Sequence, residues 1–319
     1  MNDRGDVHPD RPRRPGAWVV LVTAVVLLAA ACGTGTRATG PATLPTPTTE
    51  RTTHVSKIVV FVVENHSRDQ MLAQMPFTRG LARTYGYATR YTAMTHPSLP
   101  NYLAIASGST QGVIDDRNPA SHVLRGPTVL GQAVTSGHTA AVYAEGMPEN
   151  CASTNRGSRY AVRHNPWVYF RDERSLCQHH DVPLGALPST IRRGRLPTVS
   201  LVIPDLCHDA HDCSLASADA WLARHVTSLT AGSEWRSGRL AIVVTADEDD
   251  EHHGNNVLTV VAHPALHGTV VTEPLNHLSL SRSLSAVSGS PALNQAAGAS
   301  SLLHAFGLTA APQRRGSDQ

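Results

Sequence analysis

Five short apolar runs constrain the fold of this chain more than any other feature of its sequence. Because the apolar residues of each run are mostly consecutive rather than at alternate positions, each run is typical of a strand that is buried on both faces. Three further segments have helical spacing: Tyr102–Ser107, Val129–Ser136 and Ala216–Leu229. The pattern predicts an α/β fold with a mostly parallel central sheet and helices on both faces. The five runs are Lys57–Val63, Thr139–Glu145, Thr198–Pro204, Leu240–Ala246 and Val257–His263.

The first 31 residues are predicted to be an export signal. Four arginines precede an apolar run, Ala17–Ala31, that is shorter than the about 20 apolar residues of a membrane span. The run ends in LLAAAC, which favours a lipoprotein whose lipidated first residue is Cys32 and whose only contact with a membrane is that anchor. Ala29 and Ala31 also form a cleavage site for ordinary secretion. Both alternatives predict an exported protein, either on the cell surface or secreted.

Residues 32–54 are rich in Gly, Pro and Thr and have few large apolar side chains, so we expect a flexible tether. Residues 55–310 are long enough for one domain with a sizeable core, and residues 311–319 are expected to be a disordered tail. The net charge of +2 comes from 27 basic and 25 acidic residues, without a basic run that interleaves aromatics. Nucleic acid is therefore not expected as a partner, and we expect a monomer.

Four cysteines follow Cys32. An even number in an exported chain predicts disulfides, and the simplest of three connectivities pairs Cys151 with Cys177 and Cys207 with Cys213. A metal site is the alternative for the last pair, because two histidines lie between Cys207 and Cys213.

Polar clusters follow the first, third and fourth apolar runs. They are ENHS at 64–67, DLCHDAHDC at 205–213 and DEDDEHH at 247–253. Because the carboxyl ends of parallel strands lie at one edge of a sheet, we expect these clusters to converge there.

Oxygen ligands in two of these clusters indicate a divalent cation. Asp247 and Glu248 follow a buried strand directly, and Glu64 with Asn65 offers a carboxylate beside an amide carbonyl. Asp249 and Asp250 are expected to hold the loop instead. The alternative for the whole segment DEDDEHH is a solvated acidic turn. The alternative for ENHS is a helix cap.

Ser98 stands between two prolines at the start of an expected helix. A serine there is commonly a cap, but a neighbouring cation would make its hydroxyl a nucleophile. His211 lies in the loop that a Cys207–Cys213 bridge would pin, where Asp209 or Asp212 could fix its tautomer. His277 opens another expected helix. Arg163 and His164 suit a phosphate, although their segment also fits a surface loop.

Six segments together resemble the phosphoesterase branch of the alkaline phosphatase superfamily, which contains bacterial secreted acid phosphatases and phospholipases C. The resemblance runs from about Val55 to about Leu308. It implies the superfamily's fold and an acid phosphatase that hydrolyses phosphate monoesters, phosphoinositides among them, through a metal-assisted phosphoserine intermediate. The segments are VVENHS, THPSLPNYLAIASG, AEGMP, YAVRHNPWVYF, LPTVSLVIPDLCHDAHDCSLASADAWL and VVTADEDD.

The resemblance also implies roles for individual residues. Ser98 would be the nucleophile, with His211 as first and His277 as second choice of proton donor, and Asn101, Arg163 and His164 would bind substrate. The cation would be Mg²⁺, Ca²⁺, Mn²⁺ or Zn²⁺, and its implied ligands are Glu64, Asn65, Ser98, Asp247 and Glu248.

The sequence departs from the family at two places. Asp205 and His208 stand where relatives often have Asn, and the segment SGSPALNQAAGAS at 288–300 is looser than usual. Two other functions remain open. A phospholipase C-like phosphodiesterase is disfavoured by the short chain. A lipoprotein that binds phosphorylated lipid or sugar without turnover is disfavoured because Ser98 and the acidic ligands are retained.

Overall fold

The computed structural model describes residues 53–157 and 159–312, and these described residues belong to one compact unit. The predicted export signal, nearly all of the tether and most of the tail lie outside the described residues. Across the described ranges, no helix combines the length and apolar character needed to cross a bilayer.

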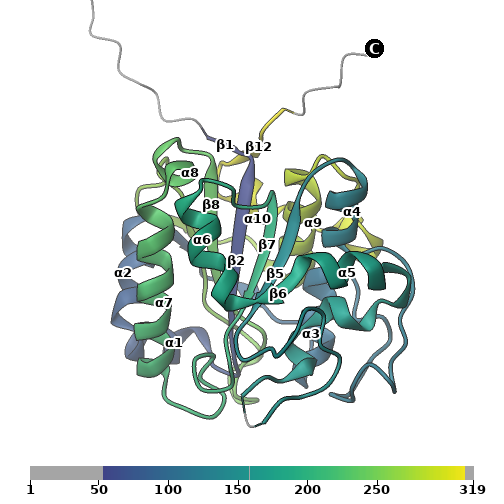
Figure 1. Ribbon diagram of the computed structural model, residues 1–319. Helices are drawn as coiled ribbons and strands as arrows, with labels where there is room; N and C mark the ends of the chain where they lie inside the picture. The colour runs from purple at the N-terminus through teal and green to yellow at the C-terminus, as the bar shows by residue number, and fades with distance from the viewer. Residues whose placement is uncertain (1–52, 158, 313–319) are drawn as a thin grey trace, which may run out of the picture. The chain divides into compact units, whose positions relative to one another are not determined.

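An eight-stranded sheet forms the centre of this unit, in the order β10-β3-β9-β8-β2-β7-β5-β6 (Figure 1). Strands β8, β2, β7, β5 and β6 are parallel to one another, and β10 is parallel to β3. The strands are β2 Lys57–Val63, β3 Gly86–Ala88, β5 Ala140–Ala144, β6 Asp181–Pro183, β7 Val199–Ile203, β8 Leu240–Ala246, β9 Thr259–Ala262 and β10 Thr269–Val271. Two-stranded sheets pair β1 His54–Val55 with β12 Thr309–Ala310, and β4 Tyr91–Thr92 with β11 Leu275–Asn276.

The five apolar runs all form strands of this sheet, and every residue of β5, β7, β8 and β9 is buried. The mostly parallel α/β sheet predicted from the sequence is therefore confirmed. Strand β9 is the exception, because it runs antiparallel to both β8 and β3. The acidic connection between β8 and β9 contains no helix, whereas a parallel crossover needs one.

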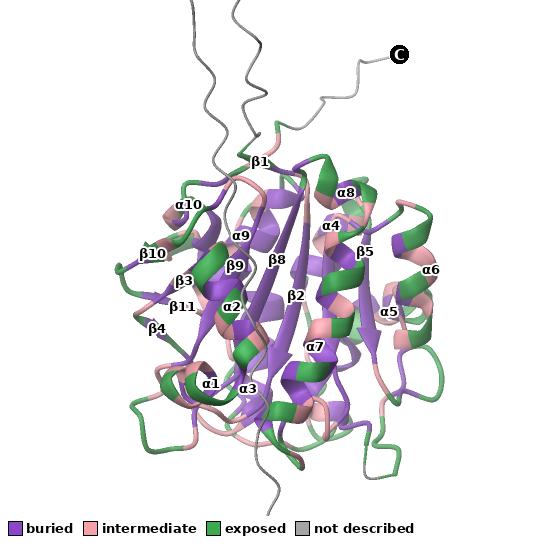
Figure 2. Cartoon of the chain, turned by 90° about the vertical axis from the view of Figure 1, so that its left-hand side faces the viewer, coloured by how far each residue is buried: buried purple, intermediate pink, exposed green. Residues whose placement is uncertain are grey.

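Helices cover both faces of the sheet (Figures 1 and 2). One layer packs around α7, and aromatic packing supports it, since the Phe61 and Trp221 rings meet edge to face at 5.9 Å. The other layer packs around α9. The first layer comprises α1 Arg68–Gln74, α2 Pro76–Thr84, α6 Leu187–Arg192, α7 Leu215–Thr230 and α8 Ser233–Arg236. The second comprises α3 Ser98–Ser107, α4 Val129–Thr135, α9 His277–Val287 and α10 Leu302–Ala305, while α5 Arg174–His180 packs on β5 and β6.

Helix α3 begins at Ser98, four residues before the predicted start at Tyr102. Pro100 is tolerated because it lies in the first turn, where its missing N–H has no partner to lose. Gly108 ends the helix with φ 68°, and a Cβ there would lie 2.2 Å from the Leu293 carbonyl oxygen. Every residue of α3 is buried, so its first turn is held rigidly under the sheet edge.

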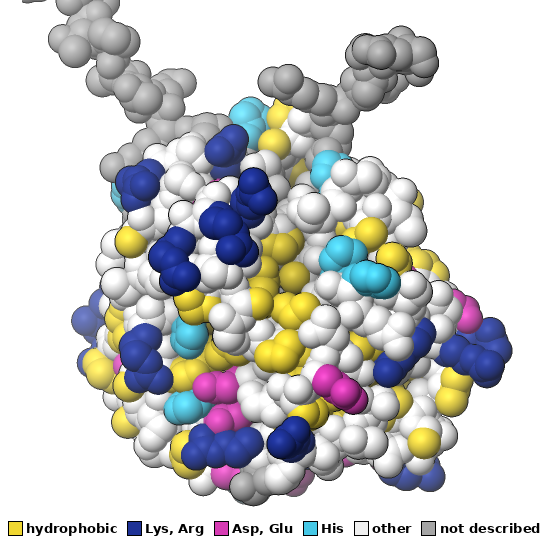
Figure 3. Space-filling view, in the orientation of Figure 1, with side chains coloured by type: hydrophobic (Ala, Val, Ile, Leu, Met, Phe, Trp, Pro, Cys, Tyr) yellow, Lys and Arg dark blue, Asp and Glu magenta, His cyan; other side chains and the backbone are white. Residues whose placement is uncertain are grey.

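The two edges of the sheet differ in charge. At the carboxyl edge, where β2, β7 and β8 end, lie the acidic clusters that follow these strands. At the amino edge, β1 leads directly into β2. Figure 3 shows a group of Lys and Arg side chains over the end where α6 and α8 lie, and larger Asp and Glu surfaces lower down on the same face.

Candidate active site

Ser98 lies at the carboxyl edge among the predicted carboxylates. Its hydroxyl donates to Glu64 Oε2 at 3.0 Å and lies 3.4 Å from Glu248 Oε1. Only 2% of Ser98 is exposed. The structure therefore brings together an alcohol and acids from three distant segments, as the sequence predicted.

Asn101 holds the loop that presents Ser98. Its side-chain oxygen accepts from the Met94 and Thr95 N–H groups, and its amide nitrogen donates to the Thr95 carbonyl at 2.8 Å and to Glu248 Oε2 at 3.1 Å. It is fully buried. These bonds occupy its amide and hold the loop, while the expected contact of Asn101 with substrate stays a prediction.

The carboxylates around Ser98 are buried and close together, which raises their pKa values. Burial raises the pKa of Asp247 to about 7. Burial, and then the charge of Asp247, raises the pKa of Glu248 to about 9 and that of Glu64 well above its usual range. Such a cluster is costly when ionised, unless a positive charge lies within it.

Orphaned acceptors show that the cluster fits a cation. Asn65 Oδ1 and Asp247 Oδ2 are buried without a hydrogen-bond partner, although Asn65 N–H donates to the other oxygen of Asp247 at 3.2 Å. Asn65 has φ 45°, so it lies in the left-handed region that Asn tolerates better than most residues. Unpaired oxygens of carboxylate and amide groups are the ligands that hard divalent cations prefer.

A second buried group adjoins Glu64. Tyr102 donates a short hydrogen bond to Glu64 and stacks on the His164 ring, with centroids 5.1 Å apart. His164 lies between Glu64 Oε2 at 3.4 Å and Asp209 Oδ2 at 3.3 Å, and is only 1% exposed. Burial, and then the charge of Arg163, lowers the pKa of His164 well below its usual range. His164 Nε2 and Asp209 Oδ2 also lack hydrogen bonds, so these groups extend the potential cation site.

His211 and Arg163 lie on the more open side of this site. Arg163 donates to His211 Nε2 at 3.1 Å, so Nδ1 of that ring carries the hydrogen and donates to Asp212 Oδ1 at 2.7 Å. Asp212, one of the two residues predicted to do so, therefore fixes the tautomer of His211. Arg163 Nε also lies 3.6 Å from Asp116, whose other oxygen accepts from the Leu99 N–H at 2.9 Å.

His277 does not meet Ser98, which differs from the expected proton-donor role. Its Nε2 donates to the Asp247 carbonyl at 2.6 Å, and its Nδ1 accepts from the Tyr91 hydroxyl at 3.0 Å. Burial lowers the pKa of His277 to about 4, so the ring is neutral and both nitrogens are occupied. The ring holds the backbone beside a carboxylate of the site.

Both predicted disulfides are present, and the Cys207–Cys213 bridge closes the loop that carries Asp209 and His211. Within this loop, Asp209 Oδ1 accepts from the His211 N–H at 2.8 Å, while the Asp209 carbonyl accepts from the Glu64 N–H at 2.8 Å. The bridge therefore supports the histidine and the carboxylate together.

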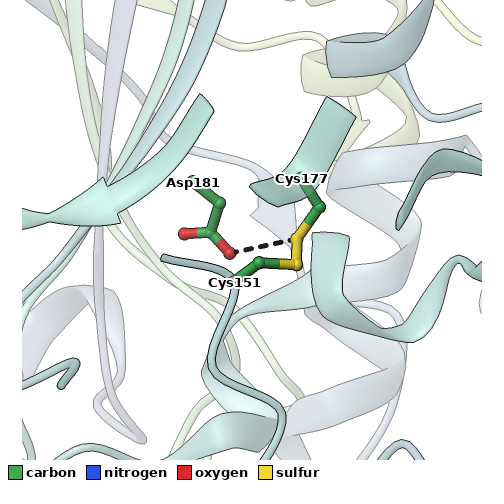
Figure 4. Close-up of side chains that lie close together, drawn as sticks. All are labelled: Cys151, Cys177 and Asp181. Atoms are coloured by element: carbon green, nitrogen blue, oxygen red, sulfur yellow. Dashed lines mark hydrogen bonds between the residues drawn. A yellow bond between two sulfur atoms is a disulfide. The ribbon is translucent and has the colours of Figure 1, made fainter. Parts of the chain in front are cut away.

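The Cys151–Cys177 bridge lies against a buried carboxyl group (Figure 4). Asp181 accepts from Asn165 Nδ2 at 2.8 Å and lies 3.5 Å from the Cys177 sulfur. Burial raises the pKa of Asp181 to about 8. The Oδ1 atoms of Asp181 and Asn165 are buried and have no hydrogen-bond partner. This network supports the β5–β6 side of the domain.

The two departures from the family have structural roles. Asp205 bonds the Cys207 and His208 N–H groups and pairs with Arg159 at 2.6 Å, while His208 Nδ1 lies 2.9 Å from Glu145. Residues 294–298 form a 3₁₀ helix, and Asn294 bonds the Ser107 carbonyl at the far end of α3 from Ser98.

Asp249 organises the acidic loop, the role that the sequence predicted for it, and it is buried. Its two oxygens accept from the N–H groups of Glu251, His253 and Asn255 at 2.7–2.8 Å. His96 bridges this loop to the site, 3.3 Å from Glu248 and 3.2 Å from Asp249.

Sequence reasoning missed two residues of the site, Tyr102 and Asp116. Tyr102 follows Ser98 by four positions, so one helical turn places both on the same face of α3, and this signal was available. Asp116 lies in an irregular loop, and no repeating pattern in the sequence predicts where the residues of such a loop lie.

The phosphoesterase family pattern matches residues 72–289 of this chain. The phosphatidylinositol-3-phosphatase of Mycobacterium tuberculosis is 32% identical over 253 residues, which cover 78% of this chain and 82% of the relative. A phosphate-repressible acid phosphatase of Penicillium chrysogenum is 26% identical over 65% of this chain and 53% of its own length.

Solved structures show the same fold at low identity. A phosphonate monoester hydrolase of Silicibacter pomeroyi aligns with a TM-score of 0.55 at 13% identity, covering 81% of this chain and 78% of its own. A protein of the alkaline phosphatase superfamily from Vibrio parahaemolyticus aligns with a TM-score of 0.52 at 11% identity, covering 76% and 69%. The chain belongs to the phosphoesterase family and has the fold of the alkaline phosphatase superfamily.

Proposed function

We propose that this protein is an exported acid phosphatase, on the cell surface or secreted, that hydrolyses phosphate monoesters with Ser98 as its nucleophile. As a member of the phosphoesterase family, the chain is a phosphoric ester hydrolase. The observation that carries the proposal is the buried Ser98 hydroxyl between Glu64 and Glu248, at the first turn of α3.

A divalent cation fits the residues present, namely Glu64, Asn65, Ser98, Asp247 and Glu248. When bound, such an ion supplies positive charge that favours the ionised serine and the negative oxygens of a phosphoryl group. Mg²⁺, Ca²⁺, Mn²⁺ and Zn²⁺ are the candidates, and the predominance of oxygen ligands favours the first three.

Individual side chains carry out the nucleophilic attack, the proton transfers and the binding of phosphate. Ser98 attacks phosphorus in line with the leaving alcohol, while the alcohol takes a proton from protonated His211. Water then attacks the phosphoserine, the bond between phosphorus and Ser98 Oγ breaks, and Ser98 leaves in the ionised form in which it attacked. The water gives a proton back to His211, whose Nε2 has its lone pair available once Arg163 turns toward phosphate. The Arg163 guanidinium is suited to hold two phosphoryl oxygens at once. His164 is buried between two carboxylates, so its role is to position Glu64 rather than to contact substrate.

The substrates are phosphate monoesters, and the relative from Mycobacterium tuberculosis makes phosphoinositides candidates among them. The protein acts as a monomer, and lipidation at Cys32 is the proposed means of membrane attachment.

The test compares three substrates with the chain from Thr49 onward: p-nitrophenyl phosphate, p-nitrophenyl phosphorylcholine and phosphatidylinositol 3-phosphate. We expect release of inorganic phosphate from monoesters and, after acid quenching, one phosphate on the peptide that contains Ser98. Faster cleavage of the phosphorylcholine diester would instead establish a phospholipase C-like enzyme. Phosphate binding without turnover in the presence of each candidate cation would establish the non-catalytic alternative.

A further inference from the structure

Five exposed arginines lie at the amino edge of the sheet, opposite Ser98. Two connections contribute them, one leading from α6 into β7 and one leading from α8 into β8. We call them the amino-edge arginines: Arg192, Arg193, Arg195, Arg236 and Arg239.

Hydrogen bonds hold the two connections side by side. The Leu196 N–H donates to Glu234 Oε1 at 3.2 Å, which joins the first connection to α8. The Ser56 and Lys57 N–H groups donate to the Arg239 carbonyl at 3.0 and 3.1 Å. The arginines therefore form one surface next to the place where β1 leads into β2, and Figure 3 shows the group of basic side chains there.

This surface has no acidic counterpart. Glu234, the carboxylate of these two connections, is 2% exposed and pairs with Lys57 at 3.3 Å. Among residues 53–157 and 159–312, no amino-edge arginine forms an ion pair, whereas Arg117 and Arg125 near the other edge pair with Asp115 and Asp172. Five guanidinium groups on one surface, none of them in an ion pair, attract a negatively charged surface.

The sequence indicates which negative surface lies nearby. The chain enters the domain at β1, on the same edge as the amino-edge arginines, and residues 17–31 upstream form the apolar run described above. The connecting residues 33–53 can span about 70 Å when extended, so their length alone leaves the orientation of the domain free. Exposed arginines that come close to a membrane are attracted to anionic lipid head groups.

We propose that the amino-edge arginines dock the domain on an anionic lipid bilayer, with the Ser98 site facing away from that bilayer. The carboxyl ends of parallel strands point away from their amino ends, so docking at one edge directs the other to the aqueous phase. A docked domain then takes phosphate monoesters from solution rather than from the lipid on which it rests.

The test measures sedimentation of the chain from Thr49 to Gln319 with lipid vesicles. This segment is a compact unit that contains every described helix and strand, and it lacks the apolar run that would itself bind lipid. The vesicles are phosphatidylcholine alone or mixed with phosphatidylglycerol, at low and at high salt. The variants are R192Q/R193Q/R195Q and, as a control of equal charge change, R117Q/R125Q/R171Q.

We expect binding to the mixed vesicles only, weakened by salt because exposed charges are screened. Loss of three arginines should weaken binding by about a hundredfold, since each contributes about fivefold near an anionic surface. The control should bind like the unsubstituted chain, and vesicle-bound protein should hydrolyse soluble p-nitrophenyl phosphate at its free rate. Equal loss in the control, equal binding to neutral vesicles, or silencing of the bound enzyme would each overturn the proposal. Sedimentation does not depend on turnover, so a failure of the proposed function would leave this result standing.

Discussion

Ser98 donates its hydroxyl hydrogen to Glu64 at 3.0 Å, although the two residues are 34 positions apart in the chain. This bond joins the first turn of α3 to the end of the central strand β2, and thereby fixes where a phosphorus atom would be attacked. Replacing Ser98 with Ala removes only the side-chain hydroxyl, which is the proposed nucleophile, so the fold should survive. Turnover of p-nitrophenyl phosphate should fall by at least about a thousandfold.

The measurement for Ser98→Ala is the initial rate, with circular dichroism to verify the fold. Ser175→Ala, at an exposed position of α5, is the matched control and should keep full activity. Normal turnover by the Ser98 variant would remove the serine from the mechanism.

Asn101→Ala should destabilise the domain by about 1–3 kcal/mol, because the Met94 and Thr95 N–H groups lose their buried acceptor. The nucleophile loop would also lose its link to Glu248, so kcat should fall while Ser98 is still present. Thermal unfolding and steady-state kinetics measure the two effects. An unchanged melting temperature would show that the loop does not depend on this amide.

Chelation should destabilise the protein more at about pH 9 than at about pH 5. The folded pKa values of Asp247, about 7, and Glu248, about 9, are raised above those of the unfolded chain. Without a cation, their contribution is fully present below the unfolded values. It is lost as pH rises from those values to 7 and 9, because the unfolded chain ionises in this window while the buried cluster stays protonated. A bound cation stabilises that ionised form.

Thermal unfolding with and without a chelator, at both pH values, checks this expectation. Glu251→Gln, which removes an exposed acid of the same loop, should leave the difference between the two pH values unchanged. An equal effect of the chelator at both values would argue against a cation held by these carboxylates.

Asp181→Asn should make the domain more stable at about pH 8. The pKa of buried Asp181 is raised to about 8, so between about pH 4 and pH 8 the unfolded chain ionises this group while the folded chain keeps it protonated. Stability then falls by about 1.4 kcal/mol for each pH unit in this window. Asn does not ionise and therefore avoids that loss, and its side-chain oxygen can still accept from Asn165 Nδ2.

Urea unfolding across this pH range measures the difference between Asp181→Asn and the unsubstituted domain. Asp172→Asn, an exposed acid of the neighbouring 3₁₀ helix, serves as the control and should keep the original pH slope. The same slope in the Asp181 variant would mean that this carboxyl is already ionised in the folded protein.

The sequence by itself determined the features that repeat along the chain or that follow directly from residue order. Continuous apolar runs indicated strands buried on both faces, and β2, β7 and β8 carry the acidic and histidine clusters at one edge because parallel strands end together. Local disulfide pairs and the position of Ser98 at a helix start also follow from spacing. The antiparallel direction of β9 did not, since it depends on how the acidic connection after β8 folds, and that connection contains no helix.

Only the tertiary structure decided what each side chain contacts. His211 was the first and His277 the second candidate for proton donor. In the structure, His211 lies on the more open side beside Arg163, whereas His277 is buried between Tyr91 and the Asp247 backbone. Asp116 reaches α3 from an irregular loop. Such contacts join segments that are far apart in the sequence. Local sequence patterns do not predict them, because they depend on how the whole domain packs.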